Sequence, residues 1–278
     1  KGHSRPVHPP SFLPRPNKVV SYRKLDLVSP VGNDIPTAWD NIVNGRSGIG
    51  RITRFDPSAL TAQIAGEVKD FDLTPYISSK EAKQMDTFIH YGVVAGMQAW
   101  KDCGLDINSI NAERVGVIVG SGIGGLPRIE ETQKDYLERG PRRISPFFVP
   151  GSLVNLVSGQ LSIGLGLKGP SYAVVSACTT GLHSIGDAAR LIEYGDADVM
   201  IAGGAESTVS PLGIGGFAAS LANRLVERAH QVESFTADVG RGNAAVARRD
   251  AAKDDLCLRR RGRPAGADHG VPDGPRRA

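Results

Sequence analysis

One stretch, Val174 to Ser207, constrains the fold of this chain more than any other. It reads VVSACTTGLHSIGDAARLIEYGDADVMIAGGAES. Tyr172–Ser176 predicts a strand, Thr180–Tyr194 a long helix, and Asp198–Ala202 a second strand. Two strands joined by a single crossover helix pair in parallel, with a right-handed connection. We therefore expect an α/β fold built on a parallel sheet.

The chain before this stretch shows the same alternation of strand and helix signals. Glu81 to Cys103 carries apolar residues at close to helical spacing, which predicts one long and largely buried helix. Arg114–Val119 predicts a short strand that ends in glycines, and Leu126–Arg139 predicts a helix. The alternation extends over residues 18–219, which we interpret as one folded domain.

The two flanks differ from this domain in composition. Residues 1–17 are rich in proline and basic residues, and they predict a disordered leader without the apolar segment of a secretory signal. Residues 220–278 change to Arg, Ala, Asp, Gly and Pro, which predicts a disordered or out-of-frame tail. Residues 18–219 hold 18 Lys and Arg against 21 Asp and Glu, so the net charge of +4 comes from the flanks. A nucleic-acid surface needs basic residues gathered on a folded face, so we expect no nucleic-acid partner.

The spacing of the cysteines and the hydropathy argue against a disulfide-rich, a metal-binding and a membrane protein. Cys103, Cys178 and Cys257 are too sparse and too far apart for a disulfide framework or a metal site. We therefore expect a reducing, cytoplasmic compartment and no metal. No apolar run approaches the ~20 residues that span a bilayer, so no membrane segment is expected.

Cys178 lies where the chemistry of a thiol can be exploited. It falls between the expected strand and the expected helix, with the small residues Ala177 and Gly181 beside it. The unpaired N–H groups and the positive end of a helix dipole favour a thiolate at such a turn, and the same N–H groups can bind an oxyanion. A free cysteine is also often a small buried apolar residue, and the local pattern leaves both interpretations open.

The run GSGIGG carries a weaker signal. Gly120, Gly122 and Gly125 satisfy the G-x-G-x-x-G pattern of dinucleotide-binding folds. Such a fold also needs an acidic residue ~20 residues further on, and the segment ISPFFVPG offers none. We therefore interpret the run as a tight glycine turn and expect no cofactor.

Several motifs, in order along the chain, resemble those of the beta-ketoacyl-ACP synthases, and the type II enzymes of dissociated bacterial systems most closely. The segment around Cys178 resembles the family's nucleophile motif and is long enough to be specific. The other matching segments are LVSPVGN, NGRSGI, KEAKQMDTFIHYG, GSGIGGL, RRISPFFVPGSLVN, LKGPSYAV and SPLGIGGF. The resemblance covers roughly residues 27–219.

The resemblance implies a fold and a reaction. The fold is a thiolase-like α-β-α-β-α sandwich, in which two similar halves each contribute a five-stranded layer, and this chain matches the N-terminal half only. The reaction is that of a 3-oxoacyl-ACP synthase of fatty-acid elongation. Cys178 corresponds to the residue that takes an acyl chain from acyl carrier protein, and the thioester then condenses with malonyl-ACP as CO₂ is lost. The family works as a homodimer.

The resemblance also implies further site residues. Ile123 corresponds to a residue that lines the acyl pocket, and Phe147 and Phe148 lie in a segment near the pocket and the dimer interface. Acyl carrier protein is acidic, so docking needs a local basic patch. Lys80 and Lys83 align with basic docking positions.

Arg142 and Arg143 are further docking candidates, although scattered basic residues also occur on an ordinary protein surface. The remaining titratable residues have ordinary structural interpretations. We expect His183 to be structural and to face away from the thiol. His90 is interpreted as a packed or capping residue, and Cys103 as part of the core.

The sequence departs from the family at both ends. The two histidine motifs, the lysine and the F-G-F-G-G-T-N loop of the family's second half do not occur, so we expect condensation to fail in this chain as written. VVSYRKLD replaces the family's first glycine turn, and the sequence beyond residue 219 is unlike that of the family. We interpret both departures as frameshifts. The alternatives are an inactive fragment or non-catalytic partner that binds carrier protein or a synthase, and a polyketide or nodulation-type synthase.

Overall fold

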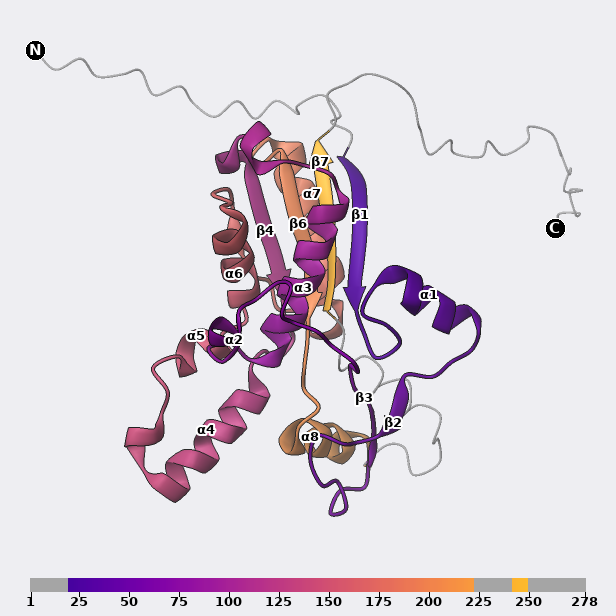
Figure 1. Ribbon diagram of the computed structural model, residues 1–278, viewed down its shortest axis with the longest axis vertical. Helices are drawn as coiled ribbons and strands as arrows, with labels where there is room; N and C mark the ends of the chain where they lie inside the picture. The colour runs from indigo at the N-terminus through magenta and orange to yellow at the C-terminus, as the bar shows by residue number, and fades with distance from the viewer. Residues whose placement is uncertain (1–19, 223–241, 250–278) are drawn as a thin grey trace, which may run out of the picture.

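The computed structural model describes residues 20–222 and 242–249, and its centre is a mixed sheet. In the described part of the chain this sheet has five strands in the order β1-β7-β6-β4-β5 (Figure 1). The strands are β1 (Val20–Val28), β4 (Val115–Gly120), β5 (Ser171–Tyr172), β6 (Val199–Ala205) and β7 (Gly242–Arg249). β4 pairs in parallel with β5 and β6, as the crossover helix requires, whereas β7 runs antiparallel to both of its neighbours.

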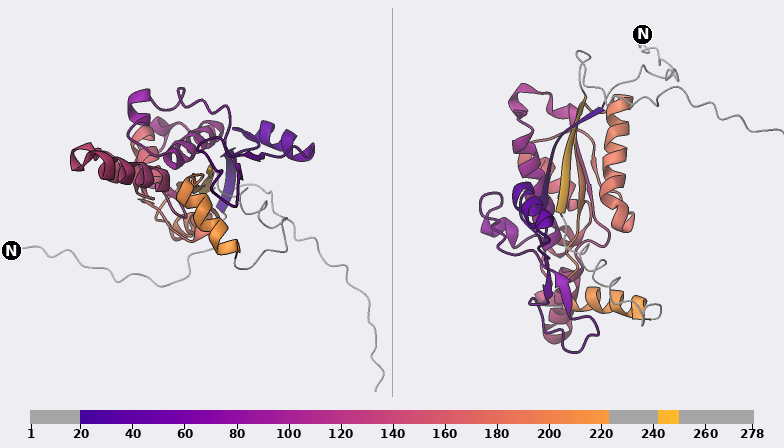
Figure 2. Two further views of the ribbon diagram at one scale, coloured as in Figure 1. Left: turned by 90° about the horizontal axis from the view of Figure 1, so that it is seen from below. Right: turned by 90° about the vertical axis from the view of Figure 1, so that its right-hand side faces the viewer.

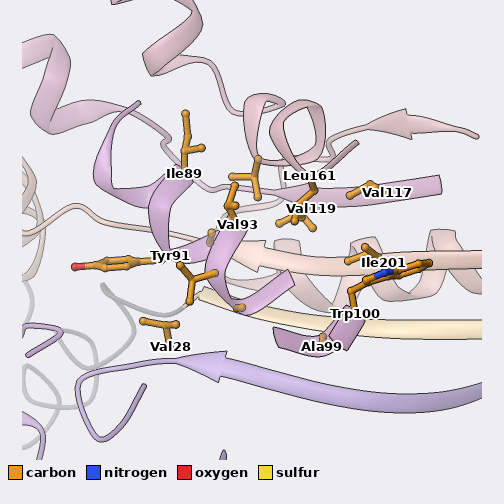
Figure 3. Close-up of a cluster of buried hydrophobic side chains, with 14 of the residues drawn as sticks. Val28, Ile89, Tyr91, Val93, Ala99, Trp100, Val117, Val119, Leu161 and Ile201 are labelled. Carbon is orange, nitrogen blue, oxygen red and sulfur yellow. The ribbon is translucent and has the colours of Figure 1, made fainter. Parts of the chain in front are cut away.

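Helices cover both faces of the sheet, and this explains why β4 and β6 are almost entirely apolar. Helices α3 (Thr87–Asp102) and α6 (Leu156–Leu165) lie on one face, and α7 (Thr180–Tyr194) lies on the other (Figure 2). Successive side chains of a strand point to opposite faces. Val117 and Val119 therefore join the α3 side of the core, shown in Figure 3, while Ile118 packs on the α7 side.

The helix expected over residues 81–103 is two helices. α2 (Ser79–Ala82) starts at Ser78, whose side chain forms a capping box with Glu81. α3 starts afresh after Asp86, whose carboxylate caps the N–H of Phe88. The apolar spacing continues through the break, so periodicity alone does not reveal it.

The other expected elements differ little from the structure, with one exception. Helices at Leu126–Arg139 (α4) and Thr180–Tyr194 (α7) have the expected bounds, and β6 runs on to Ala205. The strand expected over 172–176 is paired only at Ser171–Tyr172, because the chain then turns into the Cys178 segment.

The segment β7 corrects the expectation that everything beyond residue 219 lies outside the domain. Gly242–Arg249 pairs with β1 on one side and with β6 on the other. The sheet therefore takes a strand from the expected tail, and the expected boundary at 219 does not end the folded domain. The expected leader, residues 1–17, and the rest of the tail lie outside the described residues.

The remaining elements surround this core. They are α1 (Ile35–Val43), β2 (Ile49–Arg51), β3 (Ile64–Gly66), η1 (Ile107–Ser109), η2 (Ala112–Arg114), η3 (Pro141–Arg143), α5 (Phe148–Ser152), η4 (Ala177–Thr179) and α8 (Pro211–Ala222). The β2–β3 hairpin packs against α8 through a small apolar cluster that includes Ala65 and Ile214. No helix in residues 20–222 is long and apolar enough to cross a membrane.

Candidate active site

Cys178 lies at the middle of η4, the single turn that joins the end of β5 to α7. Its neighbour Ala177 has φ +52°, in the left-handed region that residues with a side chain rarely adopt. Two side-chain hydrogen bonds help to hold this turn: the N–H of Ser176 donates to Oγ1 of Thr180 at 2.9 Å, and Oγ1 of Thr179 donates to the carbonyl of Ser176 at 2.7 Å. Cys178 is a free, exposed thiol. Backbone strain at an exposed thiol is characteristic of a functional site.

The turn rests directly on the ends of the two central strands. A Cβ at Gly120, the last residue of β4, would lie 2.1 Å from the carbonyl oxygen of Val174. A Cβ at Gly204, in β6, would lie 3.1 Å from Gly181 in the first turn of α7. Glycine at both positions lets the strand ends come close enough to support the thiol. The sequence places these glycines at strand ends, but it does not show what they approach.

The glycine turn after β4 is held by a carboxylate that the sequence analysis did not single out. Glu206, directly after β6, accepts hydrogen bonds from the N–H groups of Gly122, Ile123 and Gly124 at 2.8, 2.9 and 3.3 Å. Oγ of Ser121 donates to the same carboxylate at 3.1 Å. Burial raises the pKa of Glu206, and these hydrogen bonds act in the opposite direction.

The hydrogen bonds to Glu206 involve the same N–H groups that a G-x-G-x-x-G turn would offer to a dinucleotide. A dinucleotide phosphate would need the N–H groups of the glycine turn, and here the carboxylate of Glu206 accepts three of them. The signal that could have revealed Glu206 is its place in the fold. The carboxyl ends of parallel strands meet at one edge of a sheet, and a lone acidic residue follows β6 where the glycine turn follows β4.

The residues expected to line the acyl pocket lie on neighbouring segments. Ile123 is 43% exposed in the glycine turn, Phe147 is exposed just before α5, and Phe148 is half-buried. The two segments are joined, because the N–H of Gly125 donates to the carbonyl of Ser152 at 3.1 Å. Their role in binding an acyl chain stays a prediction.

His183, beside the Cys178 turn, and His90, in α3, both contact polar groups. Nδ1 of His183 lies 3.2 Å from Oγ of Ser176, and its Nε2 lies 3.7 Å from the carboxylate of Asp187. His183 therefore supports the turn that carries the thiol, as a structural residue would. Nε2 of His90 lies 2.9 Å from the carbonyl oxygen of Ala82, the last residue of α2. Burial lowers the pKa of His90, so the neutral ring donates this bond and caps α2, which confirms the capping interpretation.

Two further sequence predictions concern the place of Cys103 and the binding of a metal. Cys103 follows α3, is half-buried, and its thiol donates to the carbonyl of Trp100 at 2.9 Å. The described residues contain no group of three or more His, Cys, Asp or Glu side chains that could hold a metal ion. A cavity of about 750 Å³ lies beside β1 and α3, where Lys24, Asp26 and Gln98 line it, and not at Cys178.

The four candidate docking residues are exposed, but they form two separate pairs. Lys80 lies in α2 and Lys83 ends it, and the guanidinium of Arg128 at the start of α4 donates to the carbonyl of Lys83 at 3.0 Å. Arg142 and Arg143 lie in η3, at the far end of α4 (Figure 1). α4 has 14 residues and is therefore ~21 Å long, and the two pairs lie toward its opposite ends. The structure therefore does not bring the four residues into one patch.

Comparisons with known proteins agree with this geometry. A family model described as "Beta-ketoacyl synthase, N-terminal domain" matches residues 25–246, and so includes part of β7. The chain is 54% identical over 198 residues to the 3-oxoacyl-[acyl-carrier-protein] synthase 2 of Vibrio harveyi, covering 71% of this chain and 48% of that protein. It is 47% identical over 206 residues to the enzyme of the same name from Staphylococcus aureus, covering 74% of this chain and 50% of that protein. The chain thus spans about half the length of the curated relatives it matches.

Solved structures show the same fold. A ketosynthase from a type II polyketide system, solved in complex with its acyl carrier protein, superposes with a TM-score of 0.66 at 25% identity, covering 84% of this chain and 63% of its own. The ishigamide ketosynthase/chain length factor superposes with a TM-score of 0.72 at 22% identity, covering 84% of this chain and 58% of its own. These matches confirm the expected thiolase-like α/β fold. The strained Cys178 turn, the sheet beneath it and the family match over residues 25–246 together show that this chain belongs to the beta-ketoacyl synthase family.

Proposed function

We propose that Cys178 is the acyl-accepting nucleophile of a 3-oxoacyl-ACP synthase of fatty-acid elongation. The observation that carries the proposal is the position of the exposed thiol on a turn strained at Ala177, directly before a 15-residue helix. The N-cap residue of α7, Thr179, makes no side-chain capping bond. The positive end of the helix therefore acts on the thiolate and on an oxyanion formed beside it.

The acyl transfer follows from this geometry. The thiolate of Cys178 attacks the carbonyl carbon of the thioester on acyl carrier protein. The new bond forms to Sγ, the bond to the carrier's sulfur breaks, and the carrier's thiol takes up the proton that Cys178 lost. In the complete enzyme malonyl-ACP would then lose CO₂, and its carbanion would attack the acyl thioester to release 3-oxoacyl-ACP and free Cys178. We assign this second step to the whole protein, of which the chain spans about half.

The proposal includes partners and a location. Acyl carrier protein supplies the acyl group, and the exposed lysines of α2 and the arginines of η3 are candidate contacts for it. A homodimer would form through β5, which lies at the edge of the sheet that the described residues build, where a partner strand could pair. A cytoplasmic location fits Cys103 and Cys178, neither of which forms a disulfide within the described residues.

An intact-mass assay tests the transfer. The 278-residue chain is incubated with acyl-ACP and its mass is followed with time. A gain of one acyl group that is absent from Cys178→Ala and retained by Cys103→Ala supports the proposal, because Cys103 is a second cysteine, away from the turn, whose thiol donates to the carbonyl of Trp100. The absence of any gain with folded protein would refute acyl transfer by this chain.

Two alternatives predict other results in the same assay. An inactive carrier-binding fragment would bind acyl-ACP without a mass gain. A polyketide ketosynthase is favoured by the superposition on the type II polyketide enzyme, whereas the curated fatty-acid relatives have about twice its identity to this chain. A polyketide enzyme would take acyl groups from a polyketide carrier protein faster than from a fatty-acid carrier.

A further inference from the structure

The carboxylate of Glu206 fills a nest of converging N–H groups. Three successive residues, Gly122 to Gly124, point their N–H groups at it, and Oγ of Ser121 completes the set. Nests of this kind ordinarily bind anions from outside the chain. Here the anion is a side chain from the end of the neighbouring strand, so one carboxylate fixes the conformation of the whole turn.

The same turn lies against the residue next to the nucleophile. A Cβ at Gly122 would meet Oε2 of Glu206 at 2.8 Å and Cα of Ala177 at 3.4 Å. The turn is therefore enclosed between the carboxylate on one side and the Cys178 turn on the other. Ile123 follows Gly122 directly, and its own N–H is one of those that Glu206 accepts.

We propose that Glu206 is a positioning residue that holds Ile123 beside Cys178 and thereby limits the length of the chain that reaches the thiol. The proposal rests on the proposed function, in which Ile123 lines the acyl pocket. Glu206 acts through the glycine turn and not on the thiol, because the turn that carries Cys178 is held by separate hydrogen bonds of Ser176 with Thr179 and Thr180.

The substitution Glu206→Gln separates these effects. It keeps the size of the side chain but replaces one acceptor oxygen with an NH₂ group, which cannot accept an N–H. The turn then loses part of its anchor, and Ile123 is free to move away from the thiol. Glu67→Gln is the matched control, since Glu67 is also buried and accepts the N–H groups of Thr53 and Arg54 in a different loop.

The experiment uses the full chain and thiol reagents that need no carrier protein. Rates of Cys178 alkylation are measured with N-ethylmaleimide and N-dodecylmaleimide, and the long-to-short ratio is compared between variants. Both reagents react with the same Cys178 thiolate, so the fraction of the thiol in this form cancels in the ratio of the two rates. We expect Glu206→Gln to raise the ratio about fivefold, the effect of one lost hydrogen bond, and Glu67→Gln to leave it unchanged.

Double substitution shows whether the effect runs through Ile123. Ile123→Ala should raise the ratio by itself, and adding Glu206→Gln to it should then change little, because the residue being positioned is gone. An unchanged ratio in folded Glu206→Gln, or effects that add in the double variant, would overturn the proposal. If Glu206→Gln does not fold, Ser121→Ala carries the test, since it removes one donor to Glu206 and should raise the ratio less.

The outcome is independent of the acyl-transfer assay. A chain that takes no acyl group from acyl-ACP but shows the shifted alkylation ratio would refute the proposed function and support the positioning role. A chain that is acylated but shows no shift would do the reverse.

Discussion

The carboxylate of Asp86 accepts the backbone N–H of Arg128 at 2.8 Å, although the two residues are 42 positions apart in the sequence. Its other oxygen accepts the N–H of Phe88, so one side chain caps α3 and binds the start of α4. The guanidinium of Arg128 returns to the carbonyl groups of Lys83 and Met85. The candidate docking segment and the helix that follows the glycine turn are therefore joined at one buried point.

Removing the Asp86 carboxylate should destabilise the domain strongly. Asp86→Ala loses a helix cap and leaves a buried N–H without its acceptor, so we expect a loss of ~2–3 kcal/mol in the free energy of unfolding. Asp86→Asn can still cap α3 but cannot accept both N–H groups, and should lose ~1 kcal/mol. Urea unfolding measures both. Equal losses in the two variants would contradict the double role of the carboxylate.

The same residue should make stability depend on pH. Burial raises the pKa of Asp86 above its ordinary value of 3.8. The folded protein then holds this proton more tightly than the unfolded chain does, so the contribution of Asp86 is most favourable below the ordinary pKa and declines as pH rises through the raised one. Asp86→Asn has no such proton. Its stability relative to wild type should therefore increase between about pH 4 and pH 7, and a constant difference over this range would contradict the shift.

Strain at the thiol gives a prediction about Ala177. Its φ of +52° disfavours β-branched side chains most, so Ala177→Val should lose ~1–2 kcal/mol and slow the alkylation of Cys178. Ala177→Gly relieves the strain but adds freedom to the unfolded chain, so its stability should stay within ~0.5 kcal/mol of wild type. Thermal unfolding and N-ethylmaleimide rates measure the two effects. A Val variant as stable as wild type would show that the turn is not strained.

Two glycines near the site should respond oppositely to alanine. At Gly120 the new Cβ would meet backbone at 2.1 Å, so Gly120→Ala should displace the Cys178 turn or prevent folding. At Gly186, within α7, the Cβ would meet nothing within 4 Å, and alanine is the better helix former. Gly186→Ala should therefore stabilise the domain by ~0.5–1 kcal/mol. Denaturant titration of both variants compares them, and a tolerated Gly120→Ala would contradict the close approach.

These residues show what can be predicted from the sequence and what cannot. α4 and α7 have the expected bounds because their signals are local: apolar spacing, Pro near one start, and Gly after both ends. The position of Cys178 directly before a helix is predictable for the same reason. Sequence patterns do not reveal the anchor at Glu206, because it depends on a partner distant in the sequence. They miss the break before α3 because the apolar spacing continues through it, although Ser78 and Asp86 cap the two helices locally.

The strand β7 was missed for a related physical reason. GNAAVARR has little of the apolar alternation that predicts a strand. Its extended form comes from backbone hydrogen bonding to β1 and β6 on either side, a tertiary effect that local propensity does not contain.

The separation of the basic pairs leads to a prediction about docking. Lys80 and Lys83 lie beside the point where Asp86 and Arg128 join α2 to α4, near the glycine turn, whereas Arg142 and Arg143 follow the other end of α4, a helix ~21 Å long. We expect the acyl carrier protein to use the lysine pair first. Lys80→Glu with Lys83→Glu should raise the apparent KM for acyl-ACP about tenfold, and the matching reversal at Arg142 and Arg143 should have a smaller effect.

Neither pair of charge reversals should change the rate at which N-ethylmaleimide alkylates Cys178, because this reaction needs no docking. Added salt should slow the wild type and leave the lysine variant nearly unaffected, because screening removes an attraction that the variant no longer has. A larger effect at the arginines would assign docking to the far end of α4 instead.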